Sequence, residues 1–273
     1  MIGQTKLLNK INGLINNFPR FVLLVGSKGS GKKLICNEIA KKLGYPLVSM
    51  GTGVDEVREV IQNSYRNTEP IIYVIPDTDK MSVGAKNALL KITEEPPQKA
   101  CFILTLTDIA NTLNTLKSRA CVLNMDTYTS HELYDYLKIK YDISKLTDED
   151  IKFIVNTAIV PEQVDILMSY NVPEFRKFVE KVVENLYTVS SANAFKIESK
   201  LALKKDETKW DVILFLQSLR YLYLENYYRK QEINYFKMFQ CVTKTIVEIN
   251  VKNSINLQYA LDECILQLRQ CWR

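Results

Sequence analysis

A glycine-rich segment near the start of the chain has the residue types and spacing of a phosphate-binding loop. The apolar run 21–25 leads directly into Gly26-Ser-Lys-Gly-Ser-Gly31-Lys32-Lys33, and helical periodicity begins at Leu34. Glycines allow the backbone N–H groups of such a loop to point at phosphate oxygens, and its lysine reaches the terminal phosphates. We therefore predict a phosphate site made by Gly26, Ser27, Gly29, Ser30, Gly31, Lys32 and Lys33.

Two positions that normally hold a magnesium ion carry other residues. The last position of the loop usually supplies a Ser or Thr hydroxyl to the metal, but here it is Lys33, which cannot coordinate a cation. The apolar run 71–75 should end in an Asp that holds the metal and a Glu that polarises the attacking water. The chain has Pro76 and Asp77 there. We expect no metal site, and Lys33 either adds positive charge beside the phosphates or points into solvent.

A parallel sheet is needed to bring these residues together. Five short apolar runs predict strands, and the helix-length segments between them repeat apolar residues every three or four positions. Strands that alternate with helices indicate an α/β fold with a parallel sheet covered on both faces. The predicted strands are 21–25, 46–50, 71–75, 101–106 and 121–125, and the predicted helices between them include 34–43, 54–65 and 82–94.

Only helices are predicted after residue 126. Ser130 and Thr147 are expected N-caps, Asp150 completes a capping box with Thr147, and Pro161 and Pro173 stand where helices begin. Longer helical segments start at about residue 190 and predict a further all-helical unit. The shorter helices are 130–140, 147–157, 161–170 and 173–187, and the longer ones are 191–203, 209–230, 231–250 and 254–272.

The composition excludes several classes of protein. With 273 residues, 47% of them hydrophobic and 25% charged, the chain is typical of a globular protein of two or three domains. No long apolar run or secretory leader is apparent, so we expect a cytoplasmic protein that does not bind membranes. The six cysteines are scattered and only His131 could join them, which predicts reduced thiols and no zinc site. The net charge of +5 does not by itself identify a class of partner, because basic and acidic residues are mixed along the chain.

The segment after the third predicted strand resembles the clamp-loader family of AAA+ proteins. Asn87-Ala-Leu-Leu-Lys91 and Glu94-Glu-Pro-Pro97 nearly match the family signature of N-A-L-L-K followed by E-E-P-P. The residues also fit a capped helix with Ser82 at its start, prolines at its end and a buried stripe of Ala88, Leu89 and Ile92. The resemblance implies an AAA+ P-loop domain with a parallel five-stranded sheet at 1–126, a helical lid at 127–188 and a helical collar for oligomerisation at 189–273.

Other segments resemble shorter motifs of the same family. Thr107 falls in a segment similar to the sensor-1 region, and Ser118-Arg119 is similar to the Ser-Arg-Cys motif. The resemblance implies that Arg119 reaches across a subunit boundary to a neighbour's ATP and stabilises charge on the transferring phosphoryl group. A surface salt bridge is the alternative role for Arg119. Ile2-Gly3-Gln4 resembles the adenine-pocket element, and Arg176 is a weak candidate for the sensor-2 arginine.

The departures from the family pattern resemble the delta-prime type of bacterial DNA polymerase III clamp-loader subunit. Against the pattern D-E-A-D-K-M, Pro76 takes the metal position and Asp77 the glutamate position. The family's zinc module is absent, because no cysteine lies between Cys36 and Cys101. The resemblance implies a phosphate loop that binds ATP or ADP weakly or not at all, without magnesium.

The resemblance also implies a role in DNA replication. The chain would be a structural stator that supplies Arg119 to a neighbouring ATPase subunit while the complex loads a sliding clamp onto primed DNA. The implied partners are delta-like and motor-type subunits, and, through the complex, the clamp and primer-template DNA. The alternative is a catalytically active AAA+ subunit in which Asp77 and a water replace the missing ligands.

Two features of the C-terminal helices leave alternatives open. Residues 210–230 carry more apolar and aromatic side chains than one amphipathic face needs, which indicates either core packing or contact with a partner. Five lysines before this segment form either a solvated face or a contact with DNA. The lysines are Lys196, Lys200, Lys204, Lys205 and Lys209, and the apolar and aromatic residues are Trp210, Phe215, Leu216, Leu219, Tyr221, Leu222, Tyr223, Tyr227 and Tyr228.

Overall fold

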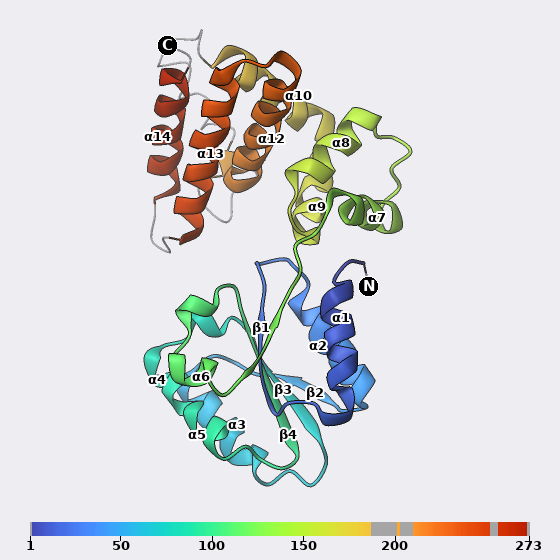
Figure 1. The fold of residues 1–273 in the computed structure, drawn as a ribbon, viewed down its shortest axis with the longest axis vertical. Helices are drawn as coiled ribbons and strands as arrows, with labels where there is room; N and C mark the ends of the chain where they lie inside the picture. The colour runs from blue at the N-terminus through green and yellow to red at the C-terminus, as the bar shows by residue number, and fades with distance from the viewer. Residues whose placement is uncertain (1, 187–200, 203–209, 252–255, 272–273) are drawn as a thin grey trace. The chain divides into compact units, whose positions relative to one another are not determined.

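The computed structural model describes residues 2–186, 201–202, 210–251 and 256–271 (Figure 1). The chain divides into two compact units, one of residues 1–128 with 160–162 and one of 129–159 with 163–273. The first boundary lies two residues beyond the predicted end of the base domain. The second predicted boundary, between residues 188 and 189, lies outside the described residues, so the division into three domains stays a prediction.

The first unit is built on a five-stranded sheet whose strands are all parallel. The sheet has the order β2-β3-β4-β1-β5. The strands are β1 (Phe21–Val25), β2 (Leu47–Ser49), β3 (Ile71–Ile75), β4 (Ala100–Leu106) and β5 (Cys121–Asn124). All five predicted strands are confirmed, and so is the α/β fold class.

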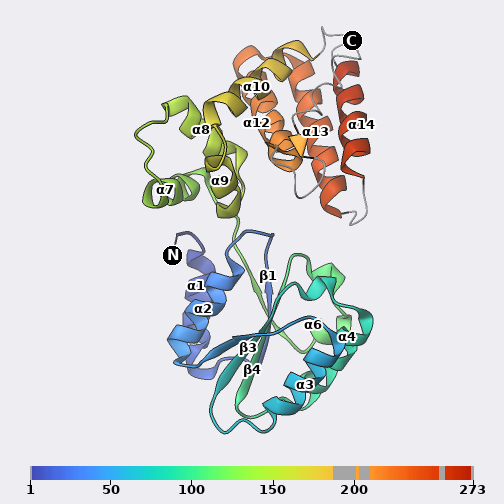
Figure 2. The ribbon, with the colours of Figure 1, turned by 180° about the vertical axis from the view of Figure 1, so that it is seen from behind.

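Helices cover both faces of this sheet (Figures 1 and 2). Alternate strand residues point to opposite faces, so that Leu23 packs with one cluster of buried residues and Val22 with the other. The face of Val22 is covered by α1 (Thr5–Leu14) and α2 (Lys32–Leu43), and the helices of the other face are α3 (Val54–Ser64), α4 (Val83–Ala88), α5 (Leu90–Glu94) and α6 (Asn114–Lys117). Short 3-10 helices are η1 (Ile15–Asn17), η2 (Thr78–Lys80) and η3 (Ile109–Asn111).

The predicted helix 82–94 is two helices, α4 and α5, which meet at Leu89. The N–H of Leu89 donates to the carbonyl of Lys86, three residues back, and this tighter turn interrupts the α-helical ladder. Ser82 caps the first helix as predicted, since its hydroxyl accepts from the N–H of Ala85. Leu89 is buried as predicted, but Ala85 is more deeply buried than Ala88.

The second unit is mainly helical. Its helices are α7 (Ser130–Lys140), α8 (Asp148–Thr157), α9 (Pro161–Met168), α10 (Val172–Asn185), α12 (Val212–Lys230), α13 (Ile233–Val251) and α14 (Leu257–Gln270), and a small parallel pair joins β6 (Leu201–Ala202) to β7 (Trp210–Asp211). The prediction of a helix over 191–203 is wrong at residues 201–202, and the rest of it lies outside the described residues. The prediction of a helix over 209–230 is wrong at residues 210–211, because these two segments pair as short strands and α12 begins only at Val212. None of the described helices is long and apolar enough to cross a membrane.

Helix caps in this unit follow the predicted chemistry with one shift. Thr147 and Asp150 form the predicted capping box, with both reciprocal hydrogen bonds present. The cap of α7 is Thr129 rather than Ser130, because Glu132 lies three residues after Thr129 and completes a second capping box. The prediction that Ser130 is the N-cap is therefore wrong by one residue.

Core packing accounts for most of the apolar residues of α12. Its inward side chains are buried against neighbouring helices, whereas Tyr228 is 67% exposed. The side chain of Trp210 and the five lysines between residues 196 and 209 lie outside the described residues. The buried residues of the predicted set are Phe215, Leu216, Leu219, Leu222 and Tyr223.

Candidate functional site

The phosphate loop begins where three strands of the sheet end together. The N–H of Gly26 donates to the carbonyl of Leu106 at the end of β4, at 3.0 Å. On the other side of β1, the N–H of Met125 donates to the carbonyl of Val25 at 2.8 Å. The loop thus leaves the carboxyl edge of the sheet between β4 and β5, at the point where the order of the strands reverses. This is the usual place for a ligand in an open parallel sheet.

The shape of the loop depends on its glycines. Gly29 and Gly31 have φ angles of 77° and 90°, in the left-handed region that side chains disfavour. A Cβ on Gly26 would lie 2.5 Å from Cγ of Met125, so the close approach of Met125, which follows β5, also requires glycine. Gly31 is the N-cap of α2, and no side chain caps the first N–H groups of this helix. These N–H groups can therefore bind an anion.

Lys32 is engaged by its own loop. Its ammonium donates to the carbonyls of Gly26 at 2.6 Å and Ser27 at 2.9 Å. Burial lowers the pKa of Lys32, and the nearby carboxylates of Asp77 and Asp79 oppose that shift. A phosphate group would have to draw this ammonium away from two carbonyl oxygens that already satisfy it.

Both metal positions lack a suitable ligand in the structure. Lys33 lies in the first turn of α2 with an exposed side chain, which favours the solvent-facing alternative. Pro76 directly follows β3 and offers no carboxylate. The residues of the chain therefore do not fit the usual magnesium site of a phosphate loop.

The carboxylate of Asp77 forms an ion pair with Lys80. The residue adopts a left-handed conformation, with φ of 48°, and its N–H donates to the hydroxyl of Thr105 at 3.3 Å. Its carboxylate lies 2.7 Å from the ammonium of Lys80. At the predicted glutamate position the chain thus has a shorter carboxylate that is already paired.

Asp79 is a polar residue of this edge that is absent from the predicted site. One of its carboxylate oxygens, Oδ2, accepts hydrogen bonds from both the N–H and the hydroxyl of Thr107. The other oxygen, Oδ1, is buried and has no hydrogen-bond partner within the described part of the chain. Thr107, the predicted sensor residue, is therefore held by Asp79.

Arg119 lies on the surface of the first unit, between α6 and β5. Its guanidinium donates to the carbonyl of Thr115 at 3.1 Å and lies 3.8 Å from the carboxylate of Glu94. The side chain is 42% exposed. Exposed ion pairs of this length are worth roughly 0–1 kcal/mol, so the guanidinium is held weakly.

Gln4 ties the N-terminal segment to the end of β5. Its side-chain amide donates to the carbonyl of Asp126 and accepts from the N–H of Asp126, both at 2.8 Å. The residue is only 2% exposed and has a φ of 62°. The glutamine of the predicted adenine-pocket element thus has a structural role in this chain.

Tyr128, another residue absent from the predicted site, contacts the phosphate loop. Its hydroxyl donates to the carbonyl of Ser30 at 2.9 Å. Tyr128 is the last residue of the first unit before the chain enters α7, and no short motif singles out an isolated tyrosine at such a position.

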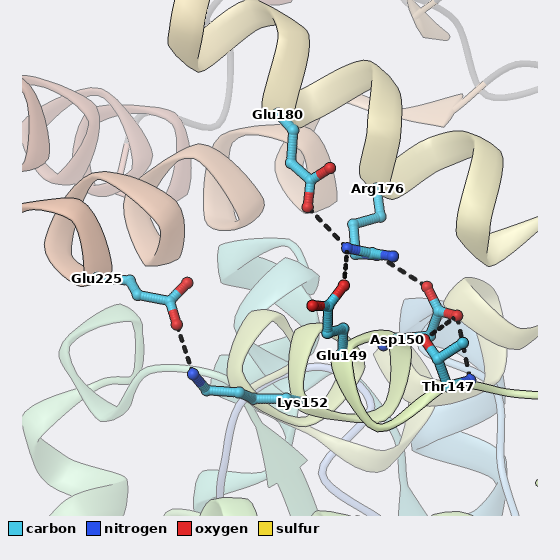
Figure 3. A network of polar contacts seen from close by, with 7 residues as sticks. All are labelled: Thr147, Glu149, Asp150, Lys152, Arg176, Glu180 and Glu225. Atoms are coloured by element: carbon cyan, nitrogen blue, oxygen red, sulfur yellow. Dashed lines mark hydrogen bonds and ion pairs between the residues drawn. The ribbon is translucent and has the colours of Figure 1, made fainter. Parts of the chain in front are cut away.

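Arg176 is saturated by carboxylates of the second unit (Figure 3). Its guanidinium contacts Asp150 at 2.8 Å, and Glu149 and Glu180 at 2.9 Å each. Burial alone would lower the pKa of Arg176, but the hydrogen bond with Asp150 and the charge of Glu180 outweigh it and raise the pKa. These contacts join α8 to α10 and explain Arg176 as a structural residue.

Comparisons with known proteins agree with these motifs. A sequence model of a family described as DNA polymerase III, delta subunit, matches residues 51–129. The gamma subunit of DNA polymerase III from Buchnera aphidicola of Acyrthosiphon pisum is 26% identical over 321 residues, covering 96% of this chain and 87% of the relative. The delta-prime subunit of Haemophilus influenzae is 32% identical over 99 residues, covering 35% of this chain and 30% of the relative.

A gamma subunit from Buchnera aphidicola of Schizaphis graminum is 30% identical over 136 residues, and the match covers 46% of this chain and 38% of that relative. Solved structures with similar folds include a gamma-subunit-related protein of Thermotoga maritima, with a TM-score of 0.55 and 17% identity over 98% of this chain and all of that chain. The RuvB branch migration motor of the same organism has a TM-score of 0.50 and 16% identity, and covers 72% of this chain and 82% of its own. These structural likenesses show an AAA+ fold. With the motifs above, the matches show that the chain is similar to the gamma and delta-prime subunits of bacterial DNA polymerase III.

Proposed function

We propose that the chain is a structural subunit of a clamp loader in DNA replication. In this proposal it supplies Arg119 to the ATP site of a neighbouring subunit, while its own phosphate loop is empty or holds ATP or ADP without hydrolysing it. Its partners are delta-like and motor-type subunits, and it acts on the sliding clamp and primer-template DNA through the complex.

The observation that carries the proposal is that Lys32, Asp77 and Thr107, three polar side chains of the predicted site, are each engaged within the chain. Lys32 bonds to two loop carbonyls, Asp77 pairs with Lys80, and Thr107 bonds to Asp79. An active site would instead direct these groups toward the phosphates and the attacking water.

The chemistry of hydrolysis supports the same conclusion. Phosphoryl transfer in phosphate-loop enzymes depends on a metal ion that bridges phosphate oxygens and on a residue that positions the water. Lys33 and Pro76 remove the two side chains that would hold the metal, and the carboxylate of Asp77 is turned to Lys80. The site retains elements of anion binding but lacks those of hydrolysis.

Arg119 is suited to reach the ATP of a neighbouring subunit, because the contacts of its guanidinium within its own chain are weak. The side chain is exposed, and its contact with Glu94 is long at 3.8 Å. Moving the guanidinium to a phosphate on another subunit would exchange this pair for a charge-assisted bidentate contact. The 3.8 Å pair also fits the alternative in which Arg119 is a surface residue, and the experiment below separates the two.

The second candidate function is an active ATPase subunit. The similarity to gamma and tau subunits favours it, because it extends over most of this chain in one of those relatives. In that case Asp77 would leave Lys80, and a water would take the place of the missing metal ligands.

The deciding experiment measures nucleotide binding and ATP turnover by the isolated chain, with and without magnesium, beside a Lys32→Ala control. We expect no turnover and a nucleotide affinity that magnesium does not change. Turnover that Lys32→Ala abolishes would instead favour the active ATPase.

The role of Arg119 is tested in the complex reconstituted with subunits from the same source. We expect Arg119→Ala to reduce the ATPase rate of the complex at least about a hundredfold without preventing its assembly. Arg58→Ala is a matched control, because Arg58 is also an exposed arginine, paired with Asp55 at 3.7 Å. An unchanged rate with Arg119→Ala would leave Arg119 as a surface residue.

A further inference from the structure

Three cysteines gather where α13 and α14 lie side by side (Figures 1 and 2). All six cysteines of the chain are free thiols in the described part of the structure. Cys241 lies near the middle of α13, Cys264 lies on α14, and Cys271 directly follows α14. Cys264 is 1% exposed, whereas Cys241 and Cys271 are half-buried. Each of these three thiols lies within electrostatic reach of the other two.

Cys241 and Cys264 are hydrogen-bond partners across the contact between the two helices. The thiol of Cys241 also lies 3.5 Å from Oε1 of Gln267, one turn after Cys264. The hydrogen bond between the thiols raises the pKa of Cys241 and lowers that of Cys264, although burial opposes the lowering. Cys241 therefore holds its proton, and a thiolate forms first on Cys264.

A cavity of about 140 Å³ lies between α13 and α14 beside this pair. Its lining includes Gln267, which contacts Cys241, and Thr245, which is a neighbour of Cys264 and donates to the carbonyl of Cys241 at 3.2 Å. A cavity of this size holds several water molecules. A small polar oxidant can therefore come close to the two sulfur atoms.

Tyr223 of α12 lies beside the same thiols. Its side chain is fully buried, and its hydroxyl has no hydrogen-bond partner within the described residues. Burial raises the pKa of Tyr223, and the charges of Cys264, Cys241 and Cys271 raise it further, so the hydroxyl keeps its proton. An unpaired buried donor is unfavourable. An oxygen atom added to a neighbouring sulfur would give this donor an acceptor.

We propose that Cys264 and Cys241 are a peroxide-reactive pair of thiols that forms a disulfide between α14 and α13. The thiolate of Cys264 attacks one oxygen of hydrogen peroxide, the O–O bond breaks, and hydroxide leaves and takes up the proton that Cys264 released. The sulfur of Cys241 then attacks the sulfenic acid on Cys264, whose S–O bond breaks, and the hydroxyl leaves as water with the proton of Cys241. Two thiols are oxidised to one disulfide, and one peroxide is reduced to two water molecules. This chemistry needs no partner subunit and is independent of the proposed function.

Cys36 and Cys101 provide a contrast within the same chain. They belong to one core cluster of the first unit, but burial raises the pKa of each thiol to about 12. The thiol of Cys101 donates to the carbonyl of Pro19, at 3.2 Å. Neither thiol readily forms the thiolate that attacks a peroxide, so we expect both to stay reduced.

The test treats the reduced, folded chain with hydrogen peroxide, blocks the remaining thiols with N-ethylmaleimide in denaturant, and maps the peptides without reductant. We expect a cross-linked pair of peptides that contains Cys241 and Cys264, has lost two hydrogen atoms, and separates with dithiothreitol. Cys36 and Cys101 should be recovered with the blocking group. The cross-link should also raise the melting temperature of the chain by about 5 °C, because it restricts the unfolded state.

Two variants separate the pair from its neighbour. Cys241→Ser should form no cross-link and should leave a sulfenic acid on Cys264 that dimedone traps. Cys271→Ser is the matched control, because it removes the third thiol of the cluster, and it should cross-link at the rate of the unchanged chain. A cross-link between Cys241 and Cys271 would overturn the proposal, and so would oxidation of Cys36 and Cys101 as fast as that of the pair. An unchanged chain that keeps its thiols at peroxide concentrations that oxidise free cysteine would overturn it as well.

Discussion

The carboxylate of Asp79 accepts two hydrogen bonds from Thr107, one from its backbone N–H at 3.2 Å and one from its hydroxyl. The bonds link the turn after β3 to the end of β4, two neighbouring strands whose carboxyl ends form the edge that carries the phosphate loop. A threonine held in this way is positioned without any ligand. The link therefore belongs to the stability of the edge, and its contribution can be measured.

Replacing Asp79 by Ala should destabilise the chain by about 1–3 kcal/mol, because hydrogen bonds to a charged acceptor are lost and Thr107 is left with unpaired donors. Asp79→Asn should cost less, since its amide oxygen can still accept from Thr107. Urea denaturation of the two variants measures the difference in the free energy of unfolding. Thr107→Val in the Asp79→Ala background should add little, because the bonds are already absent. Full additivity of the two changes would contradict the link.

The pair of Asp150 and Arg176 predicts a dependence of stability on pH. Burial by itself would raise the pKa of Asp150, but hydrogen bonds from Thr147 and Arg176 outweigh it and hold the pKa below its ordinary value. The folded state then binds this proton less readily than the unfolded state does. The stability that Asp150 contributes is present above about pH 4 and is lost as the pH falls through the folded-state pKa.

Asp150→Asn should therefore lower the free energy of unfolding at pH 7, by about 2 kcal/mol or more, and by progressively less below pH 4. Denaturant titrations at pH 7, 4 and 3 follow the difference. Asp148→Asn is the control, because Asp148 lies in the same first turn of α8 but is exposed and outside the network. A cost of Asp150→Asn that stays constant from pH 7 to 3 would count against the charged pair.

Much of the first unit follows from its sequence, because its signals are local. The five strands are apolar runs of a parallel sheet, and the glycines of the loop stand at fixed spacings, so periodicity and composition place both. The cap of α7 was misplaced from Thr129 to Ser130 because both residues have a suitable hydroxyl. Only the position of Glu132 decides between them.

The hydrogen bonds and ion pairs that engage the polar side chains of the site could not be predicted from local sequence patterns. Asp79 meets Thr107 only because β3 and β4 are paired in a particular register, and 28 residues separate them in the sequence. The partners of Arg176 lie on two helices, Glu149 and Asp150 on α8 and Glu180 on α10. They meet only because these helices pack together. The bonds of Lys32 to its own loop depend on the curl of the backbone, which residue types alone do not specify.

The close approach of Met125 to the phosphate loop predicts that Gly26→Ala is destabilising. The added methyl would lie 2.5 Å from Cγ of Met125 and 2.8 Å from its Cβ, so Met125, the residue that follows β5, would have to move. We expect a cost of about 1–3 kcal/mol in thermal or chemical unfolding. Gly13→Ala is the control, because no atom lies within 4 Å of its added methyl in α1 and helical alanine should raise stability by about 0.5–1 kcal/mol. Equal effects of the two substitutions would refute the steric argument.

Restoring the metal ligands should make nucleotide binding depend on magnesium. Lys33→Thr returns a hydroxyl to the first turn of α2, and Pro76→Asp returns a carboxylate to the end of β3, where the two ends face the same edge of the sheet. We expect the double variant to bind ADP at least about tenfold more tightly with magnesium than with a chelator, whereas the unchanged chain binds equally in both. Titration with a fluorescent ADP analogue measures the four affinities.

The variant with Lys33→Thr alone is the control for removal of the lysine's charge, which would change affinity equally with and without the metal. A magnesium dependence already present in the unchanged chain would show that other residues hold the ion, and the assignment of Lys33 and Pro76 as the missing ligands would be wrong.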